Sequence, residues 1–179
     1  ELTRGNVRTA ALIQRVSLRY AGNWRSILGS GSQWELYILS MCLVTDVELS
    51  PDDAVELDAR AVRARATSLL REILSDPAPR QRDIPTLMAF AAAVGLSAVA
   101  AEDAGPDRRA VGAELVATAL AVGTNQTCRL LSHDYLRSRT ERLDALALAQ
   151  AEERIRSLDR GGLVAHAADL AGRLAGEVG

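Results

Sequence analysis

The segment DIPTLMAFAAAVGLSAVAAED, residues 83–103, contains no charged residue between Ile84 and Ala101. A run of 18 uncharged residues reaches the lower limit of a transmembrane helix. Seven of the 18 are alanine, however, and few are the large aliphatic residues that drive membrane insertion. We therefore expect a central helix of a soluble bundle, with a membrane span as the alternative.

Apolar residues recur at helical spacing along most of the chain, whereas alternation with a period of two is short wherever it occurs. The pattern predicts helices over about 6–20, 33–46, 51–75, 84–101, 107–122, 128–159 and 163–176. Segments 84–101 and 107–122 are apolar on nearly all sides, so other protein must cover them. Residues 1–179 are thus expected to form one all-α domain, a bundle of six or seven helices around two apolar central helices.

Local signals indicate where several of these helices begin and end. Ser50 has the character of an N-cap, and Pro51 suits the first position of a helix. Gly161 and Gly162 are expected to end the sixth helix, which we also expect to bend near Ser132.

All 21 basic residues are arginine, and the formal net charge is −2. The absence of lysine excludes a Schiff-base lysine and a P-loop lysine. Together with the high alanine content, it indicates a GC-rich bacterial genome. No signal peptide is visible, and Cys42 and Cys128 lie far apart in the sequence. These features predict reduced, buried thiols in a cytoplasmic protein.

The first predicted helix carries Arg8, Arg15 and Arg19 on one face. This face is either solvated and paired with acidic residues elsewhere, or a surface for an anionic ligand or acidic protein. Nucleic acid is not favoured as the partner, because the chain is acidic overall and has no helix-turn-helix spacing. The turn GSGSQWE, residues 29–35, adds Ser32 and Trp34 as candidate ligand-binding residues, with an ordinary capped helix as the alternative.

Three residues are weak candidates for catalysis. His133 and Tyr135 follow the expected bend, and Glu114 is a carboxylate in the middle of an apolar helix. His133 is otherwise a cap or a surface residue, and Glu114 otherwise reaches solvent at the helix edge. If Glu114 is buried, it should pair with an arginine or have a raised pKa. The sequence predicts no metal site and no cofactor, because spaced metal ligands are absent from it.

The sequence carries no catalytic motif, so we expect a non-enzymatic helical protein that binds a partner or ligand. The two apolar helices favour a homo-oligomer, such as a homodimer. The alternative is a small all-α enzyme of bacterial specialised metabolism, acting on a small molecule in a pocket between helices. That alternative requires His133, Tyr135 and Glu114 to converge on a cavity.

Overall fold

The computed structural model describes residues 9, 13, 16, 31–49, 58–75, 83–124 and 128–176. All regular structure in these residues is helical, which confirms the all-α class and the bundle. The elements are α2 (Gly31–Glu48), α3 (Ala59–Ser75), α4 (Ile84–Ala100), α5 (Pro106–Val122), the 3-10 helix η2 (Arg129–Leu131), α6 (His133–Ile155) and α7 (Arg160–Gly176).

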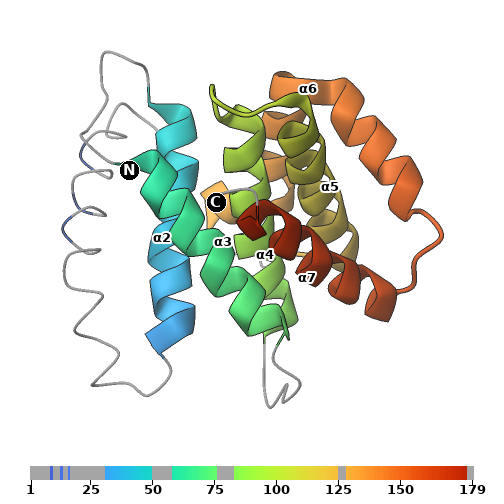
Figure 1. Ribbon diagram of the computed structural model, residues 1–179, viewed down its shortest axis with the longest axis horizontal. Helices are drawn as coiled ribbons and strands as arrows, with labels where there is room; N and C mark the ends of the chain where they lie inside the picture. The colour runs from blue at the N-terminus through green and yellow to red at the C-terminus, as the bar shows by residue number, and fades with distance from the viewer. Residues whose placement is uncertain are drawn as a thin grey trace.

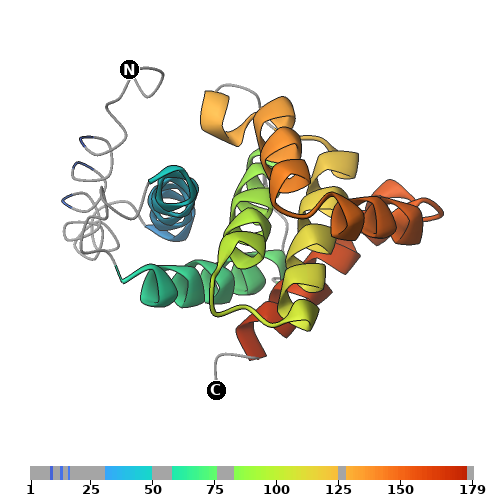
Figure 2. The same ribbon diagram turned by 90° about the horizontal axis from the view of Figure 1, so that it is seen from above.

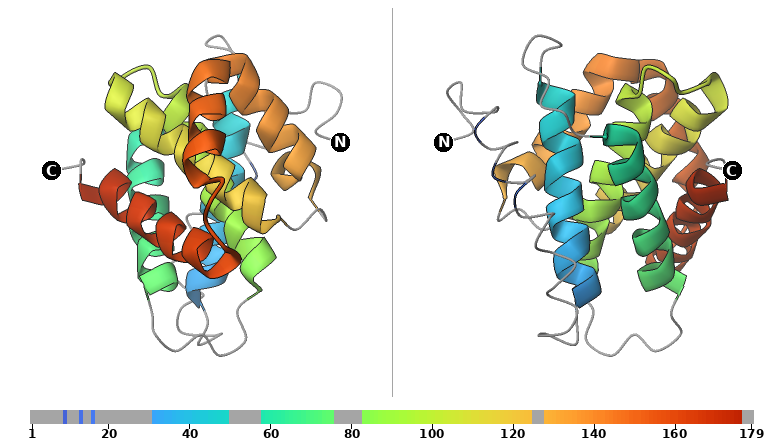
Figure 3. Two further views of the ribbon diagram at one scale, coloured as in Figure 1. Left: turned by 90° about the vertical axis from the view of Figure 1, so that its right-hand side faces the viewer. Right: turned by 60° about the vertical axis from the view of Figure 1, so that its left-hand side comes forward.

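The two apolar helices lie at the centre of the described bundle. Figure 1 shows α4 and α5 side by side in the middle, with α2 and α3 towards one side and α6 and α7 towards the other. In the view from above in Figure 2, α7 runs from the side of α6 past α5 to α3, which it also contacts. In Figure 3, α6 and α7 face the viewer in the left panel, and α2 and α3 come forward in the right panel.

The uncharged segment that begins at Ile84 forms α4, and every residue from Leu87 to Val99 is buried. Asp83 caps this helix by accepting a hydrogen bond from the Thr86 N–H, and Pro85 occupies its first turn. Because α4 contacts α2, α3, α5 and α6, protein surrounds it on all sides. Among the described helices, none combines the length and the apolar character needed to cross a bilayer.

Helix α5 is the second central helix, and it is buried from Val111 to Leu120. It begins at Pro106 and ends at Gly123, whose φ of 103° lies in the left-handed region that favours glycine. One copy of the chain buries both apolar helices. Their composition therefore does not by itself require a partner copy.

The described bounds of α3, α6 and α7 differ from the predicted ranges 51–75, 128–159 and 163–176. The described α3 begins at Ala59, because Asp58 is not helical and its side chain accepts a hydrogen bond from the Ala61 N–H at 2.9 Å. The start predicted at Ser50 lies outside the described residues. Gly161 and Gly162 do not end a helix; they lie in the first turn of α7. Asp159 caps that turn by accepting from the Gly162 N–H at 2.7 Å.

The bend expected near Ser132 corresponds to the start of α6, since Ser132 caps that helix after η2. A second break was not predicted. Asp144 has a non-helical backbone (φ −158°, ψ 80°), so α6 consists of two helices joined at a kink. The Asp144 carboxylate accepts a hydrogen bond from the Ala147 N–H at 2.9 Å and thereby caps the second half.

Candidate functional site

A pocket of about 560 Å³ lies where α2 ends, α3 begins and α4 ends, beside the kink of α6. We call it the Arg63 pocket. Its polar lining consists of Asp46, Arg60, Arg63, Ser97, Glu102 and Asp103. Its apolar lining consists of Val47, Leu49, Ala59, Ala100, Ala101 and Leu143. The volume is that of a typical small-molecule site.

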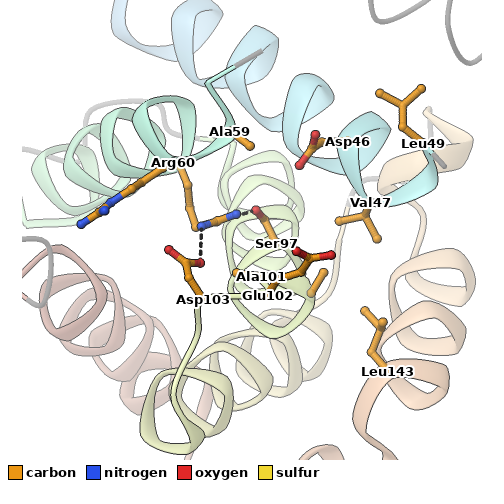
Figure 4. A pocket seen from close by; sticks show the side chains of 12 residues that line it. Asp46, Val47, Leu49, Ala59, Arg60, Ser97, Ala101, Glu102, Asp103 and Leu143 are labelled. Atoms are coloured by element: carbon orange, nitrogen blue, oxygen red, sulfur yellow. Dashed lines mark hydrogen bonds and ion pairs between the residues drawn. The ribbon is translucent and has the colours of Figure 1, made fainter. Parts of the chain in front are cut away.

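Arg63 is the buried charge of this pocket, with only 9% of its side chain exposed. It lies on the face of α3 that packs against the core, next to Val62 and one turn before Ala66. Its Nε donates a hydrogen bond to Ser97 Oγ at 2.9 Å. Its Nη1 lies 3.8 Å from the carboxylate of Asp103, whose side chain is 65% exposed. Dashed lines in Figure 4 mark these two contacts.

Ser97 is adapted to this contact. The buried threonines of the described helices, Thr45, Thr67, Thr118 and Thr140, each donate to the carbonyl oxygen of the residue four positions earlier. Ser97 instead receives a hydrogen bond from a side chain on another helix. A buried hydroxyl in the most apolar helix of the bundle therefore serves to hold Arg63.

Asp46 on α2 faces the same pocket and is half-buried. Burial raises the pKa of Asp46, while the positive charge of Arg63 acts in the opposite direction. Burial likewise lowers the pKa of Arg63; the charge of Asp103 raises it, that of Arg108 lowers it further, and that of Asp46 raises it least. Burial thus disfavours the charged form of both side chains, and the two do not form a close ion pair with each other.

The residues proposed for catalysis are not brought together. Glu114 is buried and pairs with an arginine, as expected for a buried carboxylate at this position: its Oε2 lies 2.8 Å from Arg154 Nε. Its Oε1 lies 2.8 Å from Nε2 of the half-buried His166. The alternative position of Glu114 at a solvent-exposed helix edge is wrong.

Tyr135 and His133 belong to a different part of the structure. The Tyr135 hydroxyl donates to Glu48 Oε1 at 2.7 Å, joining α6 to the end of α2. Burial raises the pKa of Tyr135, and the hydrogen bond to Glu48 adds to this effect. His133 Nδ1 lies 3.5 Å from the carboxylate of its neighbour Asp134. Neither these residues nor Glu114 line the Arg63 pocket.

Most of the ligand-binding candidates near the N-terminus are residues that the structure does not describe. Arg8, Arg15 and Arg19 are not among the described residues, and Ser32 is described only as part of α2. Trp34 is exposed and makes an edge-to-face contact with Tyr37, at a ring-centroid distance of 6.1 Å. Tyr37 in turn contacts Phe90 of α4 at 5.9 Å. Trp34 thus extends a packing cluster, and it does not line the Arg63 pocket.

Cys42 and Cys128 are free thiols, as predicted, but only Cys42 is buried. Burial raises the pKa of Cys42 to about 12, so its thiol stays protonated at neutral pH. Cys128 is partly exposed, and its Sγ lies 3.7 Å from Met41 Sδ. In the described part of the chain, no three His, Cys, Asp or Glu side chains are grouped so that they could hold a metal ion.

A second pocket, of about 570 Å³, lies between α3 and α7. Its charged residues, Arg71, Asp169 and Arg173, are all exposed. The charged side chains of this pocket are thus all exposed to water, and substitutions in it are controls for substitutions in the Arg63 pocket.

Sequence reasoning missed Arg63, Asp46 and Ser97. A signal for Arg63 was present in the sequence, because it lies four residues after Ala59 and three before Ala66 and so shares a helix face with these apolar residues. No protein-family model, curated protein or solved structure matches the chain. The functional proposal therefore depends on the geometry of the site.

Proposed function

We propose that this protein binds a small polar organic molecule in the Arg63 pocket, as a non-enzymatic helical binding protein. The observation that carries the proposal is the buried guanidinium of Arg63 at the wall of a ligand-sized pocket. Removing a guanidinium from water costs several kcal/mol, which a close ion pair or a set of hydrogen bonds must offset. Among the described residues, Arg63 has one hydrogen bond and one distant ion pair.

A purely structural role for Arg63 accounts less well for this arrangement. A buried arginine that serves the fold needs a close carboxylate to offset its desolvation. Even the half-buried Arg65 has one, since its Nε lies 2.7 Å from Glu35 Oε1. Within the described residues, the carboxylate that pairs with Arg63 is that of Asp103, which is exposed and 3.8 Å away. A leucine at this position of α3 would pack against the core without any cost in desolvation. The presence of a charged residue at this position therefore favours a ligand-binding role for Arg63 over a purely structural one.

Binding is preferred to catalysis because Glu114, His133 and Tyr135 line neither of the two pockets described. A homo-oligomer, an anionic partner at Arg8, Arg15 and Arg19, and a cytoplasmic bacterial setting stay predictions. Each of them is compatible with a ligand-binding role for the Arg63 pocket.

Filling the pocket tests the proposal. Ala59 lines the Arg63 pocket, and Ala168 lines the second pocket, so Ala59→Phe and Ala168→Phe are matched variants. The wild type and both variants are screened by thermal denaturation against a library of small polar molecules. We expect some compounds to raise the Tm of the wild type and of Ala168→Phe, but not that of Ala59→Phe.

Two results would contradict the proposal. In the first, no compound raises the Tm of the wild type. In the second, every active compound also stabilises Ala59→Phe to the same extent, which places the binding site elsewhere.

A further inference from the structure

Two opposite charges line the Arg63 pocket without touching each other. Asp46 on α2 and Arg63 on α3 influence each other's pKa, yet the structure contains no ion pair between them. Figure 4 shows Asp46 on one side of the pocket and Ser97 and Asp103 on the other. The arrangement leaves a space with a carboxylate on one side and a guanidinium on the other.

The guanidinium side is suited to a carboxylate from a ligand. The Nε of Arg63 already donates a hydrogen bond to Ser97 Oγ. Asp103 lies nearest to the terminal nitrogen Nη1, at a distance too long for a hydrogen bond. A ligand carboxylate at the terminal nitrogens would make the shorter, charge-assisted contacts that arginine prefers. Asp103 would be displaced at little cost, because its side chain already lies mostly in water.

The carboxylate side is suited to an ammonium group. Asp46 is half-buried, and its carboxylate accepts no hydrogen bond from any other described side chain or N–H group. An ammonium group from a ligand would supply this half-buried carboxylate with both hydrogen-bond donors and a charge of opposite sign.

The charge of the described lining argues against a simple anion. Among the described residues, three carboxylates line the pocket, from Asp46, Glu102 and Asp103, against the two guanidiniums of Arg60 and Arg63. The pocket is therefore slightly acidic, which disfavours a ligand with net negative charge. A ligand that is neutral overall, with one charge of each sign, matches the lining.

The remaining wall is apolar. Val47 at the end of α2 and Leu143 beside the α6 kink lie together at one side of the pocket in Figure 4. Leu143 is an exposed large hydrophobic residue, so contact with an apolar ligand group would remove its surface from water.

We infer that the Arg63 pocket binds a zwitterion of the amino-acid class with an apolar side chain. Its carboxylate binds Arg63 in place of Asp103, its ammonium binds Asp46, and its side chain packs on Val47 and Leu143. The inference rests on the proposed function and adds the chemistry of the ligand to it.

Calorimetric titration of the full chain with three matched probes tests the inference. L-leucine carries both charges, isocaproate carries only the carboxylate, and isoamylamine carries only the ammonium. We expect L-leucine to bind at least about tenfold more tightly than either of the other two, because each charge contributes one charge-assisted contact. The inference of a zwitterionic ligand would be overturned if isocaproate or isoamylamine bound as tightly as L-leucine. It would also be overturned if no binding of L-leucine could be detected.

Two variants locate the contacts. Asp46→Asn should lower the affinity for L-leucine about tenfold but should not lower that for isocaproate, whereas Asp169→Asn in the second pocket should change neither. Asp103→Asn should raise the affinity for L-leucine by only about two- to threefold, because the carboxylate it removes is exposed and competes weakly. Unchanged affinity in Asp46→Asn, or weaker binding in Asp103→Asn, would contradict the inference.

The two proposals fail differently. If the library screen finds ligands that Ala59→Phe excludes but L-leucine does not bind, the pocket is a binding site for another chemistry. If Ala59→Phe excludes no compound at all, the proposed function itself is wrong.

Discussion

Two glycines allow the central helices to approach closely. A Cβ added to Gly95 of α4 would lie 2.6 Å from the carbonyl oxygen of Gly112, and one added to Gly112 of α5 would lie 2.8 Å from the carbonyl oxygen of Gly95. Backbone atoms cannot move aside as a flexible side chain can. The contact therefore requires glycine on both helices, for reasons of space and not of backbone conformation.

Gly95→Ala should accordingly lower the free energy of unfolding by about 1–3 kcal/mol, the usual cost of overpacking a core. Gly172→Ala in α7 is the control, since a Cβ there meets nothing within 4 Å. It should raise the free energy of unfolding by about 0.5–1 kcal/mol through helix propensity alone. Urea unfolding measures both variants. Equal stability of the two would show that α4 and α5 are not in close contact.

Asp46 should make stability depend on pH in a defined direction. Burial raises its folded-state pKa, so ionisation of this carboxylate costs stability at every pH above its unfolded-state pKa, and the cost disappears as the pH falls below that value. Asp46→Asn should therefore be more stable than the unliganded wild type at pH 7, and the difference should vanish towards pH 3. Urea unfolding at the two pH values checks this. A less stable Asp46→Asn at pH 7 would mean that the carboxylate serves the fold.

At the scale of elements, the kink of α6 depends on the Asp144 cap. The side chain that caps the second half of the helix is the one whose backbone leaves helical geometry. Asp144→Ala should cost about 1 kcal/mol in urea unfolding, whereas Asp144→Asn, which can still accept from the Ala147 N–H, should cost much less. Equal losses in the two variants would assign the effect to the charge of Asp144 and not to its hydrogen bond.

Glu114 connects three elements, because its carboxylate on α5 contacts Arg154 of α6 and His166 of α7. Glu114→Gln keeps the shape of the side chain but removes its negative charge, so that the ion pair with Arg154 becomes a hydrogen bond to a neutral amide. We expect it to lower the free energy of unfolding by about 1–3 kcal/mol. Glu153→Gln breaks an exposed pair with Arg156 and should change it by less than about 0.5 kcal/mol. Comparable losses in both variants would contradict a special role for the buried contact.

Sequence reasoning predicted α4 and α5 within one residue at each end, because proline and aspartate mark their starts and both are apolar on all sides. It failed at Asp144, where a polar residue inside a polar helix gave no sign that its side chain would compete with the helical backbone. It also failed at Gly161 and Gly162, since Asp159 supplies a cap that outweighs the low helix propensity of glycine.

At the scale of the whole molecule, the candidate site could not be predicted because it joins residues that are distant in sequence. Arg63, Ser97 and Asp46 lie on three helices, and their proximity follows from packing around α4. The spacing of residues within one helix shows which face of that helix a residue lies on. It does not show which other helix packs against that face. The sequence left the burial of Glu114 open and required a charged partner or a raised pKa only if it was buried, and it did not show that Arg154 would be the partner.

The enclosure of α4 and α5 within one chain predicts how folding depends on protein concentration. The apolar surface that the sequence assigned to an oligomer interface is already covered by α2, α3, α6 and α7. The midpoint of urea unfolding should therefore stay constant when the protein concentration is raised a hundredfold, because no association is coupled to burial of the core. Light scattering on the same samples reports the oligomeric state independently. An oligomer with a constant midpoint would be assembled from folded monomers through another surface. A midpoint that rises with concentration would show that the bundle needs a second copy to be stable, and that one chain does not complete its own core.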